Sequence, residues 1–197
     1  MAIERIDTRQ IQRMPWKNGG GETVEVAVWP EDAILDTFEW RVSMASVTRP
    51  GHFSAFHGID RTLAVLNDGA LDFDVDGQPS FRLCVHDTPW SFPGDATVFA
   101  TPVGGAVIDF NVMTRRGRWR HQLQALSITS AHTLTADCDA ALLFCQSGNA
   151  ECACAGEAPV GLSDGIALLI KEQPSTITLH PIEPTRMYWV RLFCLSS

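Results

Sequence analysis

The sequence predicts an all-β protein built as a sandwich or a barrel. Apolar and polar residues alternate with a period of two in several short stretches, most clearly at 71–75 and 175–180. Clusters of turn residues such as 67–69 and 93–95 separate these stretches. No long stretch carries the apolar stripe of an amphipathic helix, and at most a helical turn fits near residues 8–13. Many short strands at such spacing are typical of sandwiches and barrels.

The predicted strands fall into two groups, one within residues 24–113 and the other within residues 119–193. Between them lies the arginine-rich segment 114–118, which contains a glycine and is the best candidate for a junction. We therefore expect a first domain over residues 1–114 and a second over residues 115–197, with N-terminal residues available to complete the second.

The composition excludes a disordered chain and argues against two classes of partner. Hydrophobic residues make up 45% of the 197 residues and charged residues 19%, which is enough apolar material for a core. The formal net charge of −8 argues against binding to nucleic acid or to an anionic membrane, and we expect neither partner. The N-terminus lacks the apolar segment of a signal peptide, and no run nears the roughly 20 apolar residues of a membrane span. The expected location is the cytoplasm.

Four arginines form a local exception to the acidic charge, namely Arg115, Arg116, Arg118 and Arg120. They are either part of a solvated loop or strand edge, or an anion-binding or interface patch. The first interpretation is the more common one for a run of charges, and the sequence leaves both open.

Six cysteines occur without the spacing of a metal site. They lie at positions 84, 138, 145, 152, 154 and 194, with no Cys-x-x-Cys pair and no histidine cluster after them. In a reducing cytosol they are expected to be free thiols, several of them buried as small hydrophobic residues. The close pair Cys152 and Cys154 leaves a metal site as a minor alternative.

Polar residues two positions apart give the sharpest functional indication. Side chains at i and i+2 of a strand point to the same face, so each such doublet separates its polar groups from its apolar neighbours. The doublets are Thr23 and Glu25, Arg41 and Ser43, and Asp109 and Asn111. These residue types present hydrogen-bonding groups in fixed geometry, whereas solvent faces usually carry Lys and Glu. The doublets therefore indicate either an ordinary solvent face or a polar ligand site in the lumen of a barrel.

Two further segments could add to such a site. The first contains three consecutive glycines directly after Lys17 and Asn18, and glycine allows close backbone approach. It lacks the Gly-Lys-Ser/Thr of a phosphate-binding loop, so the alternative is a flexible turn. The second, residues 49–61, contributes Ser54 and Arg61. A cationic site here would attract a carboxylate, which a guanidinium can bind in bidentate fashion; the alternative is a set of local salt bridges.

Ser54, His57 and Asp60 could be drawn as a catalytic triad. A spacing of three residues within a turn does not bring three such groups into line, and no Gly-x-Ser-x-Gly elbow is present. We therefore expect no catalytic residue among them.

At these motifs the chain resembles the HutD/Ves family. The matching blocks are PWKNGGGETVEV (15–26), FEWRVSMASV (38–47), GHFSAFHGIDRTLAVLNDG (51–69) and DFNVMTRRG (109–117), which span most of the first half. The second half matches more in pattern than in motif. The resemblance implies two cupin-like, jelly-roll β-barrels packed together in one chain, an arrangement called a bicupin.

The metal positions of cupins can be compared with this chain. The first cupin motif has His-x-His five residues after a glycine, and the chain has Gly51 followed by His57-Gly-Ile59. In the second motif Val107 stands where a ligand histidine belongs, and Asn111 keeps its place. Valine cannot bind a transition metal and a single histidine makes a poor site. We therefore expect no metal and no cofactor.

The family is associated with bacterial histidine utilisation. The resemblance therefore implies a non-catalytic binding protein for a small carboxylate, such as N-formylglutamate or a formate-like ion, with a regulatory role in that pathway. The Ves branch is described as induced by environmental stress, so the link to histidine is not general. The residues implied for ligand binding are Lys17, Asn18, Thr23, Glu25, Arg41, Ser43, Ser54, Arg61, Asp109 and Asn111.

Two other functions stay open. The first is a metal-independent enzyme of the isomerase, lyase or deformylase type, in which Glu25 or Asp109 acts as a general base with a raised pKa. The second is a protein-interaction role, because six Trp and ten Phe could supply an interface or a homodimer. Core packing explains most of these aromatic residues more simply.

Overall fold

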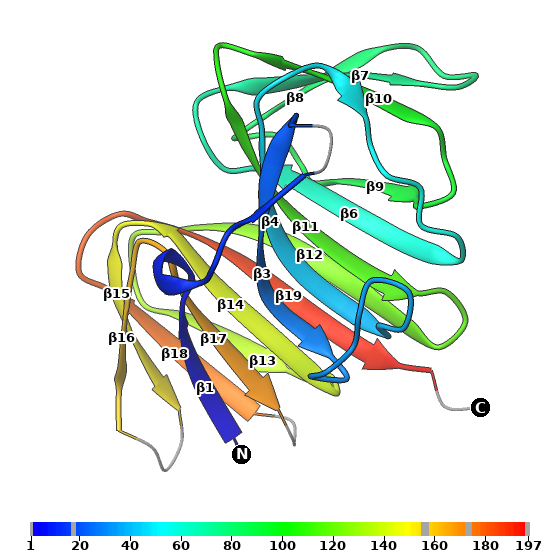
Figure 1. The fold of residues 1–197 in the computed structure, drawn as a ribbon. Helices are drawn as coiled ribbons and strands as arrows, with labels where there is room; N and C mark the ends of the chain where they lie inside the picture. Colours follow the sequence, from blue (N-terminus) through cyan, green and yellow to red (C-terminus); the bar gives the residue numbers. More distant parts are fainter. Residues whose placement is uncertain (1, 17–18, 155–157, 172–174, 196–197) are drawn as a thin grey trace. The chain divides into compact units, whose positions relative to one another are not determined.

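The computed structural model describes residues 2–16, 19–154, 158–171 and 175–195 (Figure 1). Its regular structure there consists of β-strands and one short 3-10 helix, η1 (Thr8–Gln10), where a helical turn was expected. The all-β prediction is therefore confirmed. Nothing helical in this part of the chain is long and apolar enough to cross a membrane.

The chain divides into two compact units. We call residues 11–119 the N-terminal unit, and residues 1–10 together with 120–197 the C-terminal unit. The division thus falls after the arginine-rich segment. The first residues join the C-terminal unit because strand β1 (Ala2–Asp7) pairs along β17 (Ile166–Lys171).

Two antiparallel sheets make up the N-terminal unit (Figure 1). A six-stranded sheet has the order β2-β3-β4-β11-β6-β9, and a four-stranded sheet has the order β5-β10-β7-β8. The strands are β2 (Met14–Pro15), β3 (Gly21–Trp29), β4 (Trp40–Val47), β5 (Gly51–His52), β6 (Ile59–Val65), β7 (Ala70–Val75), β8 (Phe81–Cys84), β9 (Trp90–Pro93), β10 (Val98–Val103) and β11 (Val107–Arg115).

A core of buried apolar side chains lies between these two sheets. The six-stranded sheet contributes aliphatic residues from β4, β6 and β11, namely Val47, Leu63, Val65 and Val107. The four-stranded sheet contributes Leu71, Phe73, Val75, Leu83, Val98 and Ala100. The face of the six-stranded sheet that carries Leu63 and Val65 is therefore its inner face.

The C-terminal unit also contains two antiparallel sheets, in the orders β1-β17-β14-β19-β12 and β13-β18-β15-β16. Its remaining strands are β12 (Trp119–Ile128), β13 (His132–Ala136), β14 (Ala140–Ser147), β15 (Asn149–Cys154), β16 (Val160–Ser163), β18 (Ser175–Pro181) and β19 (Thr185–Cys194). Its apolar core includes Cys145, Cys152 and Cys154 as free thiols, so the prediction that several cysteines are buried is confirmed.

The sheets are open and do not close into barrels. Closure would require strands at the edges of one sheet to pair with those of its neighbour, and the described strands pair only within the four sheets. The edge strands β2 and β5 have two residues each, which leaves few backbone groups for such pairing. The prediction of two closed barrels is therefore not confirmed.

Candidate functional site

Antiparallel pairing brings the predicted doublets together on the inner face of the six-stranded sheet. Strand β11 lies between β4 and β6, and β3 lies on the far side of β4 (Figure 1). Directly opposed residues of antiparallel strands point to the same face. Three cross-strand rows result: Thr23, Ala45, Asp109 and Val65; Glu25, Ser43, Asn111 and Leu63; and Arg41, Met113 and Arg61. Because Leu63 and Val65 belong to the core between the sheets, the polar residues of these rows share the inner face.

We call six of these residues the inner polar cluster: Glu25, Arg41, Ser43, Arg61, Asp109 and Asn111. All except Glu25 are buried, and the Glu25 side chain is 32% exposed. Apolar side chains lie on both sides of the cluster. On one side is the core that contains Leu63, and on the other is a smaller apolar group of Phe38, Ile59 and Met113. Charged side chains are seldom buried unless they are paired or needed for function. Each buried charge in the cluster is therefore expected to have either a partner or a function.

Arg41 is paired within the cluster. Its Nε donates to Glu25 Oε2 at 2.6 Å, and its Nη1 donates to Ser43 Oγ at 3.2 Å. The carboxylate of Glu25 therefore compensates the buried charge of Arg41, as a buried cation requires.

Arg61 is buried, and no carboxylate among the described residues is hydrogen-bonded to it. Its Nη1 donates to the backbone oxygen of Ser54 at 3.3 Å, and the guanidinium lies 4.9 Å from the ring centre of Phe92. Its Nε is buried and donates to no group in the described part of the chain. Burial lowers the pKa of Arg61 to about 10, so the side chain stays cationic at neutral pH. A desolvated guanidinium with a free donor is an anion-binding group.

Asp109 is a buried acid whose negative charge favours the protonated form of Arg61. Burial raises its pKa to about 7, and the positive charge of Arg61 and the backbone N–H of Ala45 oppose this rise. Asp109 Oδ1 is buried and accepts no hydrogen bond from the described residues, and the same holds for Asn111 Oδ1. Within the described structure, Arg61 Nε is thus an unpaired donor on the same buried face as the unpaired acceptors Asp109 Oδ1 and Asn111 Oδ1. Leaving a buried polar group unpaired costs about 1–3 kcal/mol of stability.

Four of the ten residues implied for ligand binding lie outside the inner polar cluster. Thr23 lies in the same row as Asp109, but its Oγ1 accepts a hydrogen bond from Trp16 Nε1 at 2.8 Å. Ser54 is exposed and contributes its backbone oxygen to Arg61. Residues 17 and 18 lie outside the described residues.

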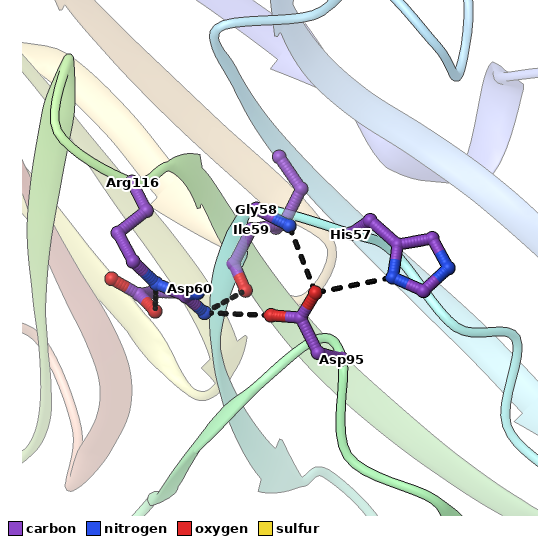
Figure 2. Close-up of polar contacts among 6 residues, drawn as sticks. All are labelled: His57, Gly58, Ile59, Asp60, Asp95 and Arg116. Carbon is purple, nitrogen blue, oxygen red and sulfur yellow. Dashed lines mark hydrogen bonds and ion pairs between the residues drawn. The ribbon is translucent and has the colours of Figure 1, made fainter.

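The serine, histidine and aspartate of segment 54–60 do not form a triad. His57 Nδ1 lies 3.2 Å from Asp95 Oδ1, and Asp60 accepts a hydrogen bond from Arg116 Nε at 2.8 Å (Figure 2). Within the described structure no hydrogen bond joins Ser54 to His57. His57 and Asp60 have other partners because the chain passes from irregular structure at Ser54 through a turn at His57 into strand β6 at Asp60.

Asp95 and Arg116 form a network that sequence reasoning missed (Figure 2). Asp95 Oδ1 accepts from the backbone N–H of Gly58 at 3.1 Å, and Asp95 Oδ2 accepts from Arg116 Nη2 at 3.0 Å. Arg116 also donates to the backbone oxygen of Ile59 at 3.2 Å. The Gly58 N–H and the Arg116 charge hold the pKa of Asp95 below its usual range. The turn signature Pro-Gly-Asp marked the position of Asp95 but not its partners.

This network fixes the segment that covers Arg61. Phe53 and Phe56 precede Gly58, and their ring centres lie 5.4 and 5.5 Å from the Arg61 guanidinium. Asp95 holds Gly58 in this segment, so it acts on Arg61 as a positioning residue.

The other arginines of the predicted cluster are also engaged locally. Arg118 Nη1 lies 3.0 Å from Glu39 Oε1, and Arg115 donates to the backbone oxygen of Phe38 at 2.8 Å. In the C-terminal unit the guanidinium of Arg120 lies 3.8 Å from the ring centre of Phe193. These contacts favour the interpretation as a strand edge over an anion-binding patch.

Metal-ligating residue types do not gather anywhere in the described structure. No group of three or more His, Cys, Asp or Glu side chains there is placed to bind a metal ion. The expectation that the protein works without a metal or cofactor stays a prediction.

A HutD family model matches residues 8–187. The chain belongs to the HutD family. Among curated relatives, an uncharacterized 21.2 kDa protein of the hutC 3′ region from Pseudomonas putida is 37% identical over 154 residues, which cover 78% of this chain and 79% of the relative. Protein Ves from Citrobacter koseri is 35% identical over 128 residues, which cover 64% of this chain and 65% of Ves. The resemblance found in the sequence motifs is thus confirmed.

Solved structures support the same membership. A conserved protein of unknown function from Pseudomonas aeruginosa PAO1 has a TM-score of 0.90 at 32% identity, covering 98% of this chain and all 100% of that one. HutD from Pseudomonas fluorescens SBW25, solved in a formate condition, has a TM-score of 0.84 at 26% identity, covering 99% and 100%. A cupin 2 conserved barrel domain protein from Leptotrichia buccalis has a TM-score of 0.63 at 10% identity, covering 95% of each chain, and shows that the fold is cupin-like.

Proposed function

We propose that this HutD-family protein binds a small organic carboxylate on the inner face of its six-stranded sheet, through Arg61, and that this binding regulates histidine utilisation in the cytoplasm. The observation that carries the proposal is the buried guanidinium of Arg61, whose Nε has no partner among the described residues. A carboxylate would supply both the acceptor and the negative charge that this group lacks. In this proposal each unit is a cupin-like jelly roll, and the ligand lies between the sheets of the N-terminal one.

The unpaired groups around Arg61 also favour particular ligands. Asp109 Oδ1 and Asn111 Oδ1 are buried acceptors without a donor in the described structure. A ligand with a carboxylate and an N–H or O–H group would pair its carboxylate with Arg61 Nε and its donor with Asn111 Oδ1. N-formylglutamate carries two carboxylates and an amide N–H, whereas formate carries a carboxylate alone. The formate condition of the Pseudomonas fluorescens structure makes formate a natural first probe.

A metal-independent enzyme is the second candidate, and Asp109 is the observation in its favour. A carboxyl group with a pKa of about 7 can act as a general base at neutral pH. Glu25, the other base considered, is partly exposed and ion-paired with Arg41 at 2.6 Å. If the protein catalyses a reaction, Asp109 is therefore the better base.

Titration calorimetry with formate, N-formylglutamate and urocanate tests the proposal. We expect saturable binding of at least one probe, and Arg61→Ala should weaken it about 10- to 100-fold, the effect of one charge-assisted hydrogen bond. Arg82→Ala is the matched control, because Arg82 is exposed and paired with Asp72 at 2.6 Å. NMR of the mixture over hours would show whether the ligand stays intact. Chemical conversion of the probe would favour the enzyme, and equal affinity in Arg61→Ala would remove Arg61 from the site.

A further inference from the structure

Arg61 and Asp109 carry opposite charges on strands that flank one another, β6 and β11. Each charge acts on the other: Asp109 supports the protonated form of Arg61, and Arg61 supports the ionised form of Asp109. Yet Arg61 Nε and Asp109 Oδ1 are both buried and hydrogen-bonded to nothing in the described structure. The two charges thus stabilise one another. Among the described residues Arg61 Nε stays an unpaired donor and Asp109 Oδ1 an unpaired acceptor, so both can pair with a bound ligand.

The other charges around Asp109 are already neutralised. On β3 and β4, Glu25 and Arg41 pair with each other at 2.6 Å. On the four-stranded sheet, Asp72 pairs with the exposed Arg82. The side chains that this sheet directs toward the inner face of the six-stranded sheet are apolar. Strand β9 contributes Trp90 and Phe92, and His57 in the segment before β6 is exposed and bonded to Asp95. In the described structure, Arg61 is therefore the one cation left to balance the Asp109 carboxylate.

We propose that a carboxylate ligand binds at Arg61 together with one proton, which is held on Asp109. This inference rests on the proposed function. A bound carboxylate takes over the positive charge of Arg61 and adds a second negative charge beside Asp109. Two carboxylates in one buried site cannot both stay ionised, so one of them takes up a proton from solvent. The proton bonds to Asp109 Oδ1, and the resulting O–H donates to an oxygen of the ligand, which keeps its charge and its contact with Arg61.

The sign of the pH dependence follows from this proton. Free Asp109 is protonated below a pH of about 7 and ionised above it. Binding above that pH must therefore take up a proton, whereas binding below it need not. By linkage, affinity is constant at low pH and falls about tenfold for each pH unit above about 7. The ligand carboxylate itself ionises near pH 4 and stays charged throughout this window.

The experiment is calorimetric titration with formate and with N-formylglutamate from about pH 6 to about pH 8.5, in pairs of buffers with different ionisation enthalpies. We expect about one proton taken up per ligand near pH 8.5 and almost none near pH 6. Asp109→Asn carries no titrating proton and should bind with no proton uptake and no pH dependence. Asp72→Asn, which changes an exposed carboxylate, should keep the wild-type proton uptake.

The outcomes separate this inference from the proposed function. Binding of a probe without proton uptake near pH 8.5 overturns the inference and leaves carboxylate binding intact. Proton uptake that persists in Asp109→Asn places the proton elsewhere and also overturns it. No binding of either probe by the wild type overturns both proposals. If Asp109→Asn does not fold, carbon-13 NMR of the wild-type carboxyl groups decides: the Asp109 titration midpoint must rise when the probe is added, and an unchanged or lower midpoint overturns the inference.

Discussion

The guanidinium of Arg61 lies 4.9 Å from the ring centre of Phe92, and the rings of Phe53 and Phe56 lie at 5.4 and 5.5 Å. A cation among three aromatic rings is held in place and shielded from water, which strengthens its attraction for an anion. The rings come from strand β9 and from the segment before β6. Both the strand and this segment therefore set the surroundings of the Arg61 guanidinium.

Removing one ring should weaken ligand binding more than it weakens the fold. Phe92→Leu keeps an apolar side chain in the core but removes a cation–π contact worth about 0.5–2 kcal/mol. We expect a loss of affinity of about 2- to 30-fold in calorimetry, with a small decrease in the melting temperature. Phe81→Leu is the matched control, since Phe81 packs in the same core but against Phe73 and Trp90. An equal loss of affinity in both variants would contradict a specific role for Phe92.

The stability of the protein without ligand should also report on Asp109. In the folded state Asp109 keeps its proton up to a pH of about 7, whereas in the unfolded chain an aspartate ionises near pH 3.9. Between these values the folded state binds more protons, so raising the pH removes stability. Asp109→Asn does not titrate, so its stability relative to the wild type should increase from about pH 4 to about pH 7, by on the order of 4 kcal/mol at most.

Denaturant unfolding of both proteins at several pH values measures this difference, because the other titrating groups cancel between them. A stability difference that is constant over this range would show that the pKa of Asp109 is not raised. The test needs no ligand and is independent of both proposals about binding.

Replacing Arg41 and replacing Arg61 should have different effects on stability and affinity, although nothing in the sequence separates the two residues. Arg41 is hydrogen-bonded to Glu25 and Ser43, so its charge is already satisfied. Arg41→Met should cost about 1–3 kcal/mol of unfolding free energy, because it leaves the carboxylate of Glu25 without its partner. Its effect on affinity should be smaller than that of Arg61→Ala. Chemical denaturation and calorimetry on the two variants compare these losses, and a larger loss of affinity in Arg41→Met would show that Arg41 contacts the ligand.

That the two residues of each doublet share one face could be predicted from the sequence, because strand alternation is local. The spacing of two in Arg41-Val-Ser43 and Asp109-Phe-Asn111 was enough to place each doublet on one face. Whether that face pointed to solvent or to the core could not be predicted. It depends on the pairing of β11 with both β4 and β6, which sets Asn111 beside Leu63 of the core.

Contacts between distant loops could not be predicted either, because they too depend on which strands pair. Asp95 reaches Gly58 and Arg116 only after the strands on either side have paired, and nothing in the local sequence specifies those partners. The family resemblance correctly indicated a cupin-like fold but also implied closed barrels. Closure depends on whether short edge strands such as β2 and β5 find partners, which a pattern of alternating residues does not determine.

The contact between Asp95 and Gly58 should be visible in the dynamics of the segment that covers Arg61. Asp95→Ala removes the acceptor of the Gly58 N–H, so the Gly58 amide should exchange with solvent faster. Phe56 should then be held less firmly and affinity should fall, with little change in overall stability because the network is exposed. Hydrogen exchange followed by NMR measures the exchange rate of the Gly58 amide, and Asp72→Ala serves as an exposed control. Unchanged exchange at Gly58 would show that the network does not hold the segment.

A close backbone approach at Gly94 gives the last test of how this segment supports the site. A Cβ added at Gly94 would lie 2.6 Å from the backbone oxygen of Phe56, closer than real Cβ atoms come, and 3.0 Å from that of Ile59, which is tight. The same backbones are hydrogen-bonded, with Gly94 N donating to the Ile59 oxygen at 2.7 Å and Phe56 N donating to the Gly94 oxygen at 2.8 Å. Gly94→Ala must therefore displace the segment that carries Phe56.

We expect Gly94→Ala to lower the unfolding free energy by about 1–3 kcal/mol and to lower affinity for the carboxylate as well, because the shift moves Phe56 away from Arg61. Gly51→Ala is the matched control, since nothing lies within 4 Å of a Cβ at Gly51. Thermal melting and calorimetry on the two variants separate the effects. If Gly94→Ala destabilises the fold but binds as tightly as the wild type, the position of Phe56 does not control the anion-binding strength of Arg61, and the aromatic rings serve packing alone.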